Sequence, residues 1–107
     1  MRLREMNDYD LMHAIVDSGR PVVTAFVERG LPVSGVLEGD LAKLADELGG
    51  DAIFGMVDVS ENPTIAAKFG APDMPCVALF RDGKHLGTSC GMSRPELMEF
   101  VARVLKH

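Results

Sequence analysis

The sequence predicts an α/β domain in which four helices flank a central mixed sheet, built from parallel strands and a C-terminal antiparallel hairpin. Strand and helix patterns alternate along the 107 residues, as in parallel strands joined by helical crossovers. Two apolar runs, "PVVTAFV" at 21–27 and "AIFGMVDV" at 52–59, are rich in β-branched residues and are typical of strands buried on both faces. An Asp82–Gly83 turn near the C-terminus supplies the positive φ angles that a tight hairpin requires.

A weak strand pattern at residues 2–5 and a helix open the chain. Asn7 is expected to cap this helix, and Gly19 followed by Pro21 is expected to end it. The apolar residues of the helix fall on one face: Leu11, Met12, Ile15 and Val16.

A longer helix is predicted between the two buried strands, with Ser34 as its N-cap and the glycines at 49–50 as its end. Its apolar residues recur at helical spacing: Leu37, Leu41, Leu44, Ala45 and Leu48. Gly35 and Gly39 each cost about 1 kcal/mol relative to alanine. The first turns must therefore be held by tertiary contacts, or the helix bends there.

The C-terminal part is predicted to hold a short helix, a hairpin and a final helix. The short helix covers "ENPTIAAKF" at 61–69, and the hairpin strands are "CVALF" at 76–80 and "HLGTSC" at 85–90. Ser93 and Glu96 form a capping box that begins the last helix. Its apolar face is Leu97, Phe100, Val101, Val104 and Leu105. We expect one domain over residues 1–107.

Composition and charge favour a globular protein with protein partners. A net charge of −5 and dispersed basic residues argue against nucleic-acid binding, and the apolar runs are too short to span a membrane. The N-terminal "MRLREMNDYD" lacks the apolar core of a secretory signal, so we expect a cytoplasmic location. No cofactor or metal is expected, because His13, His85 and His107 lie at no ligand spacing from the two cysteines.

Short motifs along most of the chain resemble those of the thioredoxin family. They match at the family's spacing without a gap from about residue 20 to residue 105, and this resemblance implies a thioredoxin-like fold. The matching stretches are "AF" at 25–26, "GLPVS" at 30–34, "ADE" at 45–47, "VDVSENP" at 57–63, "MPCVALFRDG" at 74–83, Gly91, and "LMEFV" at 97–101.

The departures from the family pattern concern its redox chemistry. By the resemblance, the two family cysteines fall on Leu31 and Ser34, the aromatic residue before them on Gly30, and the buried acid on Ala25, while a neighbouring lysine falls on Met56. Thiol–disulfide exchange needs a thiolate, which neither leucine nor serine provides. No dithiol oxidoreductase activity is therefore expected from residues 31–34, and Ser34 is interpreted as a helix cap.

The resemblance also implies a peptide-binding groove around a cis proline, Pro75, where the backbone of Met74 pairs with an extended peptide. The groove residues would be Gly30, Leu31, Pro32, Val33, Ser34, Met74, Pro75, Cys76, Gly91 and Met92. The main functional hypothesis is a redox-inactive protein-binding or assembly module that holds an unknown client protein in extended conformation and is a monomer or weak homodimer. Val33 and Met74 packing inward is the simpler structural alternative.

The two cysteines, Cys76 and Cys90, carry the alternative hypothesis of a redox protein or sensor. A plain two-residue turn pairs Cys76 with Ser89, whereas one bulged residue pairs it with Cys90. Only the bulged register puts both thiols on one face, with Cα atoms about 5.5 Å apart, where they can bond. Two unlinked thiols are favoured over a disulfide, and a single-thiol role for Cys76 is a further alternative.

Overall fold

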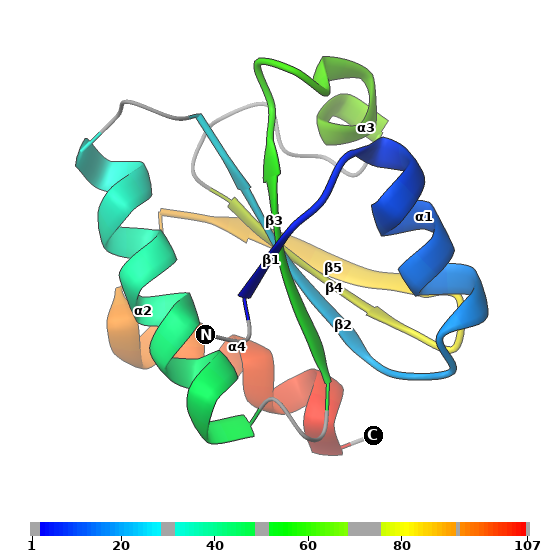
Figure 1. The fold of residues 1–107 in the computed structure, drawn as a ribbon. Coiled ribbons are helices and arrows are strands. Elements are labelled where there is room, and N and C mark those ends of the chain that lie inside the picture. The colour runs from blue at the N-terminus through cyan, green and yellow to red at the C-terminus, as the bar shows by residue number, and fades with distance from the viewer. Residues whose placement is uncertain (1–2, 29–31, 49–51, 69–75, 92, 107) are drawn as a thin grey trace.

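The computed structural model describes residues 3–28, 32–48, 52–68, 76–91 and 93–106. They form a five-stranded sheet in the order β1-β3-β2-β4-β5 (Figure 1). The strands are β1 Leu3–Glu5, β2 Val22–Val27, β3 Ile53–Asp58, β4 Cys76–Arg81 and β5 Lys84–Cys90. β3 runs parallel to both β1 and β2, whereas β4 is antiparallel to β2 and to β5. The predicted mixed sheet with a C-terminal antiparallel hairpin is confirmed.

Four helices cover the two faces of the sheet, as predicted. They are α1 Asp8–Asp17, α2 Pro32–Leu48, α3 Pro63–Lys68 and α4 Arg94–Lys106. Figure 1 shows α1 and α3 on one side of the sheet and α2 and α4 on the other. Within the described ranges, no helix combines the length and the apolar character needed to cross a membrane.

The sheet separates two apolar cores, and β2 contributes to both. Every residue of β2 is buried. Val23 and Ala25 belong to the core beneath α2 and α4, and Val22 and Phe26 to the core beneath α1 and α3. This alternation explains why the strand shows a continuous apolar run in the sequence, since each successive side chain enters a different core.

The predicted Asn7 cap of α1 and the predicted capping box of α4 are present, and the Asn7 cap proves to be a full capping box with Asp10. The side chain of Asn7 accepts a hydrogen bond from the backbone N–H of Asp10 at 2.8 Å, and the Asp10 carboxylate accepts one from the Asn7 N–H at 3.3 Å. In α4, the Ser93 N–H donates to Glu96 at 2.9 Å, and the Glu96 N–H donates to the Ser93 hydroxyl at 3.4 Å. These local patterns therefore indicated the helix starts correctly.

Two local expectations about the helices are wrong. α2 begins at Pro32, so Ser34 lies inside its first turn and is not the N-cap. Proline suits the first helical position because its missing N–H has no partner there anyway. In α1, Leu11 and Ile15 are buried but Val16 is 65% exposed, because α1 buries a narrower stripe than its apolar residues suggested.

Candidate functional site

The turn of the β4–β5 hairpin has the conformation expected from its sequence. Asp82 and Gly83 both have positive φ, 54° and 77°, as in a two-residue type I′ turn. The strands leave this turn in the plain register, with Arg81 opposite Lys84 and Phe80 opposite His85.

The register changes one residue farther along the hairpin. Leu79 pairs with Gly87 instead of Leu86, so Leu86 is an extra residue in β5 with no partner in β4, which defines a bulge. Leu86 is 47% exposed. Beyond this point every pair in the hairpin is shifted by one residue, and Cys76 lies opposite Cys90. The plain register would have placed Cys76 opposite Ser89.

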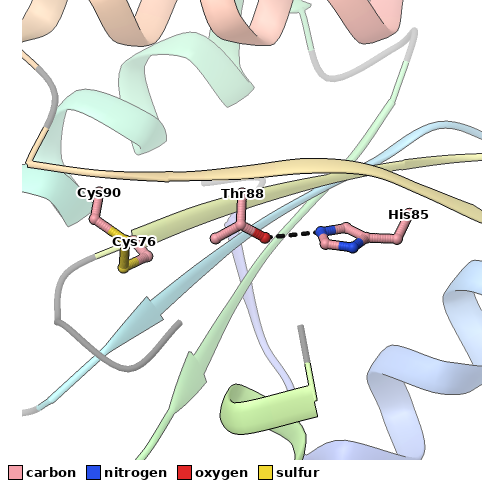
Figure 2. The surroundings of a disulfide bond; sticks show 4 residues. All are labelled: Cys76, His85, Thr88 and Cys90. Atoms are coloured by element: carbon pink, nitrogen blue, oxygen red, sulfur yellow. Dashed lines mark hydrogen bonds between the residues drawn. A yellow bond between two sulfur atoms is a disulfide. The ribbon is translucent and has the colours of Figure 1, made fainter. Parts of the chain in front are cut away.

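A disulfide joins Cys76 to Cys90 across the open end of the hairpin (Figure 2). The two Cα atoms are 4.1 Å apart, shorter than the spacing expected from the sequence and near the roughly 4.5 Å of an antiparallel pair that does not share hydrogen bonds. The prediction of two unlinked thiols is wrong, because the bulge at Leu86 turns both side chains to the same face of the sheet.

The two cysteines of this disulfide lie in different environments. Cys76 is fully buried in the core beneath α1 and α3, and its strand has a neighbour on each side. Cys90 is exposed at the end of β5, an edge strand. The disulfide thus connects the interior of the protein to its surface.

Two polar side chains of β5 lie on the same side of the hairpin as the disulfide. Figure 2 shows Thr88 between the disulfide and His85, and the His85 Nε2 is 2.7 Å from the Thr88 hydroxyl. The His85 ring also lies 5.2 Å from the ring of Phe80, measured between centroids. Neither Thr88 nor a role for His85 at this position was predicted from the sequence. The sequence feature that could have identified Thr88 is its position two residues before Cys90, because side chains two residues apart in a strand lie on the same face.

The predicted groove is described only in part. Gly30, Leu31, Met74, Pro75 and Met92 lie outside the described residues, and so do the side chains of Val33 and Ser34, although their backbone forms the start of α2. Pro32 and Gly91 are exposed, as a binding surface requires. The groove, including a cis peptide bond at Pro75, therefore stays a prediction.

The position that the resemblance assigned to a buried acid lies in the interior. Ala25 is fully buried in β2 and pairs with Met56 in β3, the residue at the position assigned to the neighbouring lysine. Both positions are thus occupied by apolar side chains of the core beneath α2 and α4. Any thiol chemistry in this chain has to proceed without a carboxylate at residue 25.

Comparison with known proteins agrees with the motifs of the sequence. The family model described as Thioredoxin matches residues 5–103. A thioredoxin from Chlorobaculum thiosulfatiphilum is 30% identical over 87 residues, which cover 81% of each chain. The structure of Fasciola hepatica thioredoxin superposes with a TM-score of 0.84 at 27% identity, covering 97% of this chain and 99% of that one. A mutant thioredoxin from Halobacterium salinarum NRC-1 has a TM-score of 0.86 at 22% identity, covering 97% and 91%, and supports the fold.

The expectation of a redox-inactive binding or assembly module is wrong. That hypothesis rested on Leu31 and Ser34, where the resemblance places the family cysteines, and it treated Cys76 and Cys90 as unlinked. The structure links these two cysteines, and the similar proteins are thioredoxins. Both findings favour the alternative, a thiol-based redox protein. The chain belongs to the thioredoxin family, and its disulfide lies on the β4–β5 hairpin.

Proposed function

We propose that this protein is a thiol–disulfide redox protein that works through the Cys76–Cys90 pair. The observation that carries the proposal is the disulfide between these residues. In the proposed reaction, two thiols from a reductant convert the disulfide to a dithiol and leave as one disulfide. The reverse reaction passes the two electrons to a disulfide of a client or an oxidant.

Its position distinguishes this pair from a structural cross-link in the interior. Cys90 is exposed and lies on an edge strand, so a reductant can reach one end of the bond without unfolding the sheet. Access of this kind is a requirement for thiol–disulfide exchange, together with a suitable thiol pKa. A role for Cys76 as a single thiol fits less well, because Cys76 is fully buried.

A protein client in extended conformation is the partner that we propose. Met74 and Pro75 of the predicted groove directly precede Cys76, and Gly91 and Met92 directly follow Cys90. A peptide held there by strand addition would bring its own sulfur close to the disulfide. Under this proposal, the predicted groove binds client proteins and positions their sulfur atoms near the Cys76–Cys90 disulfide.

The proposed cytoplasmic location determines whether Cys76 and Cys90 are reduced or oxidised when the protein is not turning over. Thiol pools keep cytosolic cysteines reduced, so a disulfide there is usually transient, catalytic or redox-sensing. We expect the dithiol to predominate in unstressed cells and the disulfide to form during turnover or on exposure to an oxidant.

The direct test is a redox titration followed by an exchange assay. The purified protein is equilibrated in glutathione buffers of graded ratio, quenched in acid and alkylated with a maleimide reagent that adds mass to each free thiol. We expect the two thiols to appear together, and a Cys90→Ala control to show one thiol over the same range. Turnover in dithiothreitol-driven insulin reduction should exceed that of a Cys76→Ser control. Absence of turnover, with a disulfide that no native-state thiol reduces, would contradict the proposal.

A further inference from the structure

We infer that the two sulfurs have different roles: exchange with partners takes place at the sulfur of Cys90, and Cys76 is the leaving and resolving thiol. This assignment rests on the proposed function. It follows from the position of each cysteine in the sheet, and the redox activity alone does not require it.

Burial separates the two cysteine residues first. Cys76 is fully buried, and its strand β4 is flanked by β2 on one side and β5 on the other. Cys90 is exposed, and β5 pairs with β4 alone among the strands that the structure describes. An incoming thiolate can therefore approach Cys90 from outside the sheet, past the edge strand β5. At Cys76 it would first have to displace part of the core.

The direction of attack separates them further. A thiolate displaces a sulfur by approaching on the side opposite to the bond that breaks, and the rate depends on access to that side. Cys76 in β4 has a partner on each side: Phe26 lies opposite it in β2, and Cys90 lies opposite it in β5. Phe26 is fully buried and shares the core of Cys76. It therefore occupies the interior side, from which Cys76 would be attacked, whereas attack on Cys90 comes from outside the sheet.

Reduction then proceeds in two balanced steps. The thiolate of the reductant attacks the Cys90 sulfur; a bond forms between these two sulfurs, the Cys76–Cys90 bond breaks, and Cys76 leaves as a thiolate that takes up a proton. A second reductant thiolate attacks the reductant's sulfur in this mixed disulfide. Cys90 leaves as a thiolate, and the reductant departs as its disulfide.

Oxidation by a client disulfide uses the same roles in reverse. The Cys90 thiolate attacks the client disulfide, which releases one client thiol and leaves the other client sulfur bonded to Cys90. The Cys76 thiolate then attacks the Cys90 sulfur, which restores the Cys76–Cys90 bond and releases the second client thiol. This step needs no movement of β5 away from β4, since the two residues already lie opposite each other.

Two matched variants test the assignment. Cys76→Ala leaves only Cys90, and Cys90→Ala leaves only Cys76. Each folded variant is mixed with the aromatic disulfide reagent DTNB, and release of the coloured thiolate is followed. We expect Cys90 to react about a hundredfold faster than Cys76, because a buried thiol reacts only when the structure opens locally. In concentrated urea the two rates should become similar, which shows that the fold causes the difference.

A measurement on the unmodified protein covers the case in which a variant misfolds. The oxidised protein is treated briefly with reduced glutathione, alkylated in acid and digested with trypsin, which places the two cysteines in different peptides because cleavage sites follow Arg81 and Lys84. We expect the glutathione adduct on the Cys90 peptide. Adducts mainly on Cys76, or equal native rates of the two variants, would overturn the assignment and leave the proposed function intact. A wild-type disulfide that resists native reduction would instead count against the proposed function.

Discussion

Cys76 of β4 lies directly opposite Cys90 of β5, with 4.1 Å between their Cα atoms. The single unpaired residue Leu86 separates this register from the one that leaves the turn. Strand side chains alternate between the two faces, so a shift by one residue moves a whole strand segment to the other face. The bulge at Leu86 therefore places the two sulfurs on the same face of the sheet, where they can bond.

The register predicts that a cysteine moved by one position cannot form the disulfide. In the double variant Ser89→Cys/Cys90→Ser, the new thiol lies opposite Val77 and on the other face of β5. We expect two free thiols after air oxidation, counted by alkylation and mass spectrometry, whereas the wild type shows none. A bond between residues 76 and 89 would show that the hairpin adopts the plain register.

The disulfide is expected to stabilise the fold without being needed for it. It closes a loop with a sequence separation of 14, for which the loss of unfolded-chain entropy predicts about 3 kcal/mol of stabilisation. Urea unfolding with and without dithiothreitol should show a decrease near this size in the free energy of unfolding, while the native far-UV spectrum is unchanged. The Cys90→Ala variant is the control and should not respond to the reductant. Unfolding of the wild type on reduction alone would contradict this expectation.

The capping box of α4 predicts a dependence of stability on pH. The N–H of Ser93 donates to the Glu96 carboxylate at 2.9 Å, and this hydrogen bond together with one from the Ser93 side chain holds the pKa of Glu96 below its ordinary value of 4.5. A carboxylate with a lowered pKa contributes stability above the unfolded-state pKa and loses it as the pH falls through the folded-state value. The wild type should melt at a higher temperature than Glu96→Gln, and this difference should be largest above pH 4.5. The gap should narrow in more acidic solution, and a gap that stays constant far below the ordinary pKa would show that the charge of Glu96 has no part in the cap.

The close approach of Met6 to Gly55 predicts coupling between these two residues. A Cβ atom on Gly55 would overlap the end of the Met6 side chain, which is buried over β3. Because only the flexible end of Met6 has to move, Gly55→Ala should lower the free energy of unfolding by less than the roughly 1 to 3 kcal/mol that overpacking a core usually costs. In a Met6→Ala background the overlap is gone, so the same substitution should cost much less. Urea unfolding of the four proteins measures this coupling, and strictly additive losses would exclude it.

Most elements of the fold follow from local sequence signals. The apolar run of β2, the Asn7 and Ser93–Glu96 capping boxes and the Asp82–Gly83 turn each encode their structure within a few residues. Alternation of such elements is sufficient to predict a mixed sheet between two helical layers. Leu31 and Ser34, at the positions that the resemblance assigned to the family cysteines, were likewise visible in the sequence, but they led to the wrong functional conclusion.

The tertiary structure alone decided how Cys76 and Cys90 are placed relative to each other. Both registers of the hairpin are compatible with the same turn, and they differ in the single residue Leu86. Its neighbour Gly87 is compatible with a bulge but does not require one. The choice between them depends on how all side chains of β4 and β5 fit the two cores and the surface at once. The burial of Cys76 and the exposure of Cys90 follow from their places in the strand order, which is a property of the assembled sheet. The sequence by itself therefore determined the scaffold, and long-range packing determined that its two thiols meet.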